Sequence, residues 1–154
     1  MNEFEFIEKY LAPLASLGGL GLKDDAAILK PRLDMDLIFT KDTMVEGVHF
    51  FKDDSGYSLS SKLLRVNLSD LAAKGASPIG YLLSVALPKT TDEIFFKNFS
   101  SGLKEVQDLF DFKLLGGDTV VTEGPIVITA TLIGETQSIT VKYLAQVLKI
   151  QLKA

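Results

Sequence analysis

The stretch SLSSKLLRVNLSDLAAKGASPIGYLLSVALP, residues 58–88, decides how this chain folds. Its first half repeats leucine every three or four residues, which predicts a helix over 58–74 with one apolar face and a cap at one of the first serines. Gly75 suits the left-handed position after the last turn, and Pro78 follows shortly after it. The apolar run 82–87, stopped by a proline, then predicts a buried strand. A helix that leads directly into a buried strand indicates a layer of helices packed on a sheet.

Further elements flank this unit on both sides. Thr90 and Glu93 form a capping-box pattern before a second amphipathic helix that reaches Phe110. Apolar periodicity predicts an N-terminal helix over residues 3–17, and the predicted strands lie at 26–29, 37–40, 114–115 and 126–133. The expected fold class is α+β, a mixed β-sheet with two main helices packed on one face, and we find no internal repeat.

The composition narrows the class of protein. The chain has 154 residues, 47% of them apolar and 23% charged, and a formal net charge of -4, which suits a globular domain and not a nucleic-acid binder. It has no cysteine, which excludes disulfides and zinc–thiolate sites. The first ten residues carry acids where a signal peptide needs basic residues, and no apolar run approaches the roughly 20 residues of a membrane span. We therefore expect a cytoplasmic location.

Four aspartates mark the candidate chemistry. Asp25, Asp42, Asp70 and Asp118 lie in four different motifs, each at the end of an apolar run or just after one. Carboxylates brought together from separate elements favour Mg²⁺, which binds through a few carboxylates and the phosphates of a substrate. The pattern therefore predicts phosphoryl transfer from a nucleotide, provided that these carboxylates share one pocket.

Each motif also has an ordinary interpretation. Asp70 would lie on a solvated helix face, on the same side as Asn67 three residues earlier. The acid of Thr40-Lys41-Asp42-Thr43 would mark an exposed strand end, Gly116-Gly117-Asp118 a plain turn, and Asp24–Asp25 a solvated loop. The single histidine, His49, is either semi-buried between apolar neighbours or a hydrogen-bonding residue that faces a substrate.

Taken together and in this order, four segments resemble the thiamine-monophosphate kinases of the aminoimidazole ribonucleotide synthetase-like superfamily. They are KDDAAIL (23–29), TKDTMVEGVHF (40–50), VNLSDLAAKGASP (66–78) and LLGGDT (114–119), and the resemblance covers residues 3–135. It implies direct phosphorylation of thiamine monophosphate by ATP to give thiamine diphosphate, with Mg²⁺ and without a phosphoenzyme. It also implies a homodimer formed by paired sheets, with ATP in a groove between subunits.

The resemblance assigns roles to single positions. The residues that would provide oxygens to Mg²⁺ are Asp25, Thr40, Lys41, Asp42, Asp70 and Asp118. His49 would contact the thiamine phosphate substrate, and Gly117 and Asp118 would contact ATP. No catalytic side chain is implied beyond the metal ligands.

Three departures from the family pattern stand out. Lys23 replaces a glycine before the paired acids, and Lys41 replaces a small hydroxyl residue. Members of this family run to about twice this length, so we expect residues 1–135 to form the N-terminal domain that binds ATP and Mg²⁺. Residues 136–154 would be an atypical tail, with the second domain missing. The alternatives are another ATP-dependent member of the superfamily, a non-catalytic Mg-nucleotide-binding or dimerisation fragment, and a purely structural role.

Overall fold

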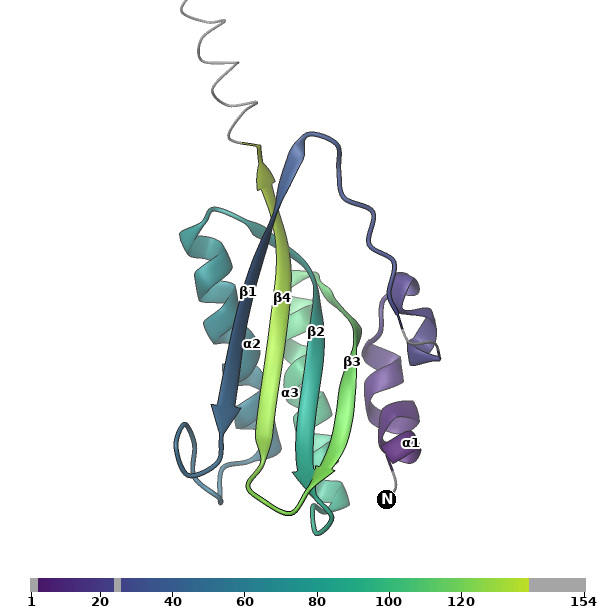
Figure 1. Cartoon of the computed structure of the whole chain (residues 1–154), viewed down its shortest axis with the longest axis vertical. Coiled ribbons are helices and arrows are strands. Elements are labelled where there is room, and N and C mark those ends of the chain that lie inside the picture. The colour runs from purple at the N-terminus through teal and green to yellow at the C-terminus, as the bar shows by residue number, and fades with distance from the viewer. Residues whose placement is uncertain (1–2, 24–25, 139–154) are drawn as a thin grey trace, which may run out of the picture.

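The structure, a computed structural model, describes residues 3–23 and 26–138 and contains one four-stranded sheet (Figure 1). The strands are β1 (Met35–Val45), β2 (Ser77–Pro88), β3 (Lys113–Thr122) and β4 (Val127–Gln137), in the order β1-β4-β2-β3. Strand β4 is antiparallel to both β1 and β2, whereas β2 and β3 are parallel. The two long helices, α2 (Gly56–Ala73) and α3 (Glu93–Phe110), lie on one face of the sheet. The predicted α+β class is confirmed.

Both long helices begin at residues other than those predicted. The side chain of Ser55 caps α2 by accepting a hydrogen bond from the Ser58 amide, so the cap lies before the serines proposed from the sequence. Asp92 caps α3 in the same way through the Phe95 amide, in place of the Thr90–Glu93 box. Gly75 has φ of 64°, which confirms the left-handed stop after α2.

The N-terminal segment is less regular than the predicted helix over 3–17. It breaks into α1 (Glu3–Phe6), a π-helical turn η1 (Ile7–Leu11) and two 3-10 segments, η2 (Ala12–Leu14) and η3 (Leu17–Leu22). Pro13 within η2 lacks the amide that a continuous helix would need. The segment packs on α3, where the rings of Phe6 and Phe96 lie 4.6 Å apart.

The core lies between the sheet and the two helices. Alternate residues of β4, Ile128, Ala130 and Leu132, are fully buried there. The predicted strand 126–133 is confirmed within β4, and its side chains Ile128, Leu132 and Ile133 are buried. The opposite side of the sheet, named the open face from here on, carries Thr129 and Thr131 in β4.

Residues 26–29 do not form the predicted strand. The segment is an irregular connection in which the Ile28 amide donates to the Gly18 carbonyl, with no partner strand beside it. Short apolar runs of this kind form strands only where a neighbouring strand can pair with them. Among the described residues, no helix is both long and apolar enough to cross a bilayer.

Candidate functional site

Strand β1 carries Thr40, Lys41 and Asp42 in its interior, not at its end as predicted. Side chains alternate between the two faces of a strand, and Met44 is buried in the core, so Thr40 and Asp42 share its helix-facing side. Lys41 and Thr43 project from the open face, where the Thr43 and Thr129 hydroxyls lie 2.9 Å apart. Lys41 can therefore offer the helix-facing side only its backbone.

Helix α2 brings Asp70 to this same side of β1. The Thr40 hydroxyl donates a hydrogen bond of 3.0 Å to Asp70 Oδ2. Two turns earlier in α2, the Lys62 ammonium donates at 2.9 Å to the carbonyl of His49, which follows β1, so α2 runs antiparallel to β1 (Figure 1). The hydrogen bond joins Thr40 of the strand to Asp70 of the helix, and Asp42 lies on the same side of β1. These three residues are named the β1–α2 oxygen cluster.

The β1–α2 oxygen cluster fits a hard divalent cation. All the side-chain atoms that it could offer to a metal are oxygens. The distance of 3.0 Å between Thr40 Oγ1 and Asp70 Oδ2 is close to the distance between adjacent ligand atoms of octahedral Mg²⁺. Mg–oxygen bonds of about 2.0–2.1 Å place adjacent ligands about 2.9 Å apart. The described residues contain no group of three or more Asp, Glu, His or Cys that could hold a metal.

Asn67 lies one turn before Asp70 in α2 and is fully buried. Its Nδ2 donates to the Leu63 carbonyl at 2.9 Å, while its Oδ1 is the sole buried side-chain polar atom without a partner in the described part of the chain. Sequence reasoning placed Asn67 beside Asp70 but gave no sign of its burial.

Gly117 and Asp118 lie within β3, not in the turn suggested by the Gly-Gly pair. Asp118 is exposed on the open face, in register with Ser84 of β2, which is in register with Thr129 of β4. Two strands separate β3 from β1, and the β1–α2 oxygen cluster is on the other side of the sheet. The chain therefore does not bring Asp118 to Asp42 and Asp70, and Asp25 lies outside the described residues.

His49 follows β1 and is exposed, which excludes the semi-buried alternative. Its Nδ1 accepts a hydrogen bond of 3.0 Å from the Val45 amide. A neutral ring that accepts at Nδ1 carries its proton on Nε2, so His49 offers a donor to an approaching group.

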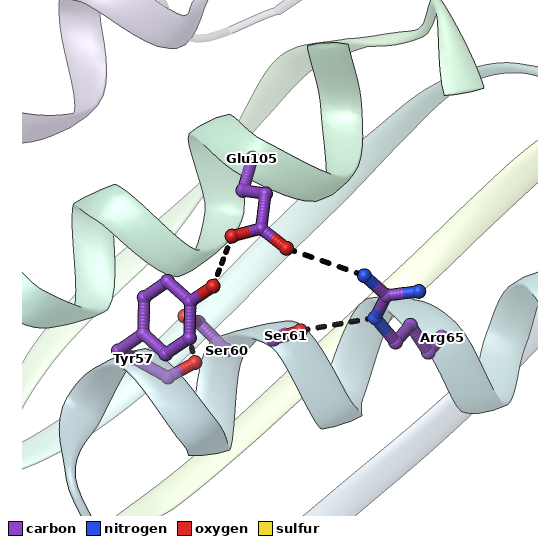
Figure 2. A network of polar contacts seen from close by, with 5 residues as sticks. All are labelled: Tyr57, Ser60, Ser61, Arg65 and Glu105. Carbon is purple, nitrogen blue, oxygen red and sulfur yellow. Dashed lines mark hydrogen bonds and ion pairs between the residues drawn. The ribbon is translucent and has the colours of Figure 1, made fainter. Parts of the chain in front are cut away.

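A second polar feature spans the outer sides of α2 and α3 (Figure 2). Glu105 of α3 accepts hydrogen bonds from Tyr57 and Arg65 of α2, and Arg65 Nε donates to Ser61 Oγ at 3.1 Å. The bond to Glu105 is the main reason why the pKa of Tyr57 is raised. Beside this network lies a shallow depression lined by Tyr57, Ser58, Ser61, Lys62, Arg65, Val66 and Ser69. Sequence reasoning missed it, although Tyr57, Ser61 and Arg65 recur at helical spacing.

Known proteins show which family has this arrangement of residues. The model of the family "AIR synthase related protein, N-terminal domain" matches residues 23–136. The chain belongs to this family. The matched range includes the β1–α2 oxygen cluster, His49 and the Gly117–Asp118 pair.

The AIR synthase related domain has several relatives named thiamine-monophosphate kinase. The protein from Caulobacter vibrioides is 49% identical over 135 residues, which cover 86% of this chain and 38% of that protein. The protein from Bacillus subtilis is 39% identical over 143 residues, which cover 88% of this chain and 42% of that protein. The chain thus spans only about two fifths of the length of these relatives.

Solved structures agree with the family assignment. Thiamine-monophosphate kinase from Stenotrophomonas maltophilia is 39% identical with a TM-score of 0.69, covering 75% of this chain and 36% of that one. AaThiL complexed with AMPPCP and TMP is 30% identical with a TM-score of 0.66, covering 79% of this chain and 43% of that one. HypE of E. coli, at 20% identity and a TM-score of 0.69, shares the fold.

Proposed function

We propose that this chain provides the nucleotide- and Mg²⁺-binding part of an enzyme that phosphorylates thiamine monophosphate with ATP. The observation that carries the proposal is the hydrogen bond from Thr40 to Asp70, which joins two motifs far apart in sequence into one oxygen-rich seam. Similarity to proteins named thiamine-monophosphate kinase supports the substrate, as does similarity to a kinase structure complexed with AMPPCP and TMP.

Phosphoryl transfer requires the protein mainly to position ATP and the phosphate that accepts the transferred group. In-line phosphoryl transfer involves little covalent participation by the protein, and a bound Mg²⁺ would neutralise the phosphates. Asp42 and Asp70 would supply negative charge to hold the cation, and Thr40 fixes one Asp70 oxygen through its hydrogen bond. His49, with its proton on Nε2, would donate to the phosphate of thiamine monophosphate.

A homodimer is part of this proposal. Three apolar side chains remain solvent-accessible on the open face, Phe39 at 61%, Leu82 at 41% and Val120 at 45% exposure. Pairing two open faces would remove this surface from water. Asp118 and Gly117 would then line a groove between subunits, where we propose that ATP binds. The same proposal includes a cytoplasmic location.

A kinase assay tests the function. The chain with MgCl2 and ATP should convert thiamine monophosphate to thiamine diphosphate at an impaired rate, because it provides only part of the active site, and aminoimidazole precursors or selenide should give no product. Asp70→Asn should lower the rate by roughly 10²–10³-fold, because it removes negative charge that holds the cation, and the cation neutralises the transferred phosphate. Calorimetric binding of Mg-ATP without turnover would contradict the kinase and identify a non-catalytic binding module.

A further inference from the structure

We propose that Lys62 of α2 is a positioning residue for His49, the single histidine of the chain. Its ammonium group donates a hydrogen bond of 2.9 Å to the His49 carbonyl and so holds the turn that carries the His49 ring. The inference rests on the contact between His49 and the phosphate of thiamine monophosphate in the proposed function. It adds a residue that acts on this phosphate only through His49.

The turn after β1 holds His49 from one side through Val45. The His49 amide donates to the Val45 carbonyl at 2.9 Å, and the Val45 amide donates to His49 Nδ1 at 3.0 Å. The backbone and the ring of His49 thus bond to the same residue at the end of β1. Because Nδ1 accepts, the neutral ring keeps its proton on Nε2, on the side of the ring away from Val45.

Helix α2 holds the other side of His49. The residue is exposed at the tip of the turn, between the bridged pair Glu46 and Phe50, and Phe50 is buried in the core. In the described part of the chain, the Lys62 ammonium is the only donor to the His49 carbonyl. Loss of this bond would free the carbonyl end of His49, so that the turn could open and the ring could leave Val45.

Lys62 differs from a lysine that supports its own helix. Lys104 of α3 pairs with Asp108 one turn later, as lysines on exposed helix faces often do. The residues four positions before and after Lys62 are Ser58 and Val66, and Lys62 forms no ion pair with any described carboxylate. Ordering a lysine side chain at the surface costs conformational entropy, so a single hydrogen bond there adds little stability. The main effect of the contact is therefore to fix the turn.

The position of the ring decides what His49 can bind. The Nε2 proton reaches a substrate oxygen only from a narrow range of directions, because N–H···O bonds weaken steeply away from linearity. Groups that contact a substrate are effective when neighbouring hydrogen bonds hold them in the productive geometry. Lys62 and Val45 hold His49 from two sides, so the ring is in place before a substrate arrives. Binding then costs less ordering of the protein.

Two measurements test the inference on Lys62→Met, His49→Ala and the double variant. Lys97→Met is the matched control, because it makes the same substitution at an exposed lysine of α3. Methionine and lysine have similar helix propensities, so both single lysine variants should fold. Melting temperatures of all variants check this directly.

Hydrogen exchange without ligand reports on the turn itself. In Lys62→Met the Val45 amide should exchange at least about threefold faster, because its bond to His49 Nδ1 opens more often. The Glu46 amide, which donates to a carbonyl outside the turn, should keep its rate, and both amides should keep theirs in Lys97→Met. An unchanged Val45 rate in Lys62→Met would overturn the inference, whether or not the chain is a kinase.

Calorimetric titration with thiamine monophosphate, in MgCl2 without ATP, measures the effect on binding. Lys62→Met should bind about 3–10-fold more weakly, the range of one hydrogen bond, whereas Lys97→Met should keep its affinity. Adding Lys62→Met to His49→Ala should cause no further loss, because Lys62 acts through the ring. Additive losses would overturn the inference and indicate that Lys62 contacts the phosphate itself. Absence of binding by the unmodified chain would count against the proposed function, and the exchange rate of Val45 would then decide the role of Lys62 by itself.

Discussion

At the scale of single residues, buried polar pairs show what burial does to a side chain. Tyr81 is fully buried in β2, donates its hydroxyl proton to Gln107 Oε1 of α3, and has its pKa raised by burial. Gln107 falls on the apolar side of a predicted helix, but the pair joins two elements 26 residues apart in sequence. Sequence spacing predicts neighbours within one helix, such as Asn67 and Asp70, and cannot reveal a partner on another element.

Tyr81→Phe should destabilise the protein by about 1–3 kcal/mol at neutral pH, because it leaves buried Gln107 Oε1 without a donor. Denaturant unfolding followed by circular dichroism measures the change. Tyr57→Phe is the matched control, since it removes a hydroxyl that pairs with Glu105 at the surface, and it should destabilise the protein clearly less than Tyr81→Phe. Equal losses in the two variants would contradict this role of the buried pair.

The same variants show how much each tyrosine contributes to the loss of stability at alkaline pH. An unfolded tyrosine ionises near pH 10, whereas burial keeps Tyr81 protonated in the folded state. Above about pH 10 the folded state therefore binds more protons than the unfolded state, so stability from Tyr81 falls as pH rises. Tyr81→Phe should lose this part of the slope, up to about 1.4 kcal/mol per pH unit, and Tyr57→Phe should keep it.

At the scale of elements, the Gly-Gly-Asp segment shows why local sequence misled. Two successive glycines favour a turn, yet residues 113–122 continue as one strand. A Cβ on Gly117 would lie 1.6 Å from the Leu83 carbonyl oxygen of β2, while one on Gly116 would meet only a Leu82 methyl at 3.7 Å. The close approach of β2 therefore explains why residue 117 is a glycine. This constraint comes from another strand, so the sequence of residues 113–122 alone does not reveal it.

Gly117→Ala should consequently destabilise the protein strongly, by about 2 kcal/mol or more, because the backbone of β2 or β3 must shift. Gly116→Ala is the matched control and should change stability by less than about 1 kcal/mol. Thermal unfolding of both variants, without ligands, makes the comparison. A similar melting temperature for the two variants would show that β2 and β3 tolerate the added methyl group.

At the scale of the whole molecule, the apolar periodicity of the sequence predicted the packing of helices on a sheet, but it could not predict the order of the strands. The last strand, β4, inserts between β1 and β2, a pairing that depends on contacts distant in sequence. This order also decides the site. It places Asp118 on the far edge and opposite face from Thr40, Asp42 and Asp70, so the three described aspartates of the four that were predicted to share one pocket divide between two surfaces.

A dimer formed through the open face would give Asp118 a second subunit as neighbour, and this can be tested directly. Leu82→Lys places a charge on that face, where desolvating it on pairing is costly. Sedimentation should show the unmodified chain as a dimer at micromolar concentration and Leu82→Lys as a monomer. Ile94→Lys, at an exposed apolar position on α3, is the control and should remain dimeric. A monomeric unmodified chain, or a dimeric Leu82→Lys, would exclude this face as the interface, because a lysine there cannot be buried without a partner.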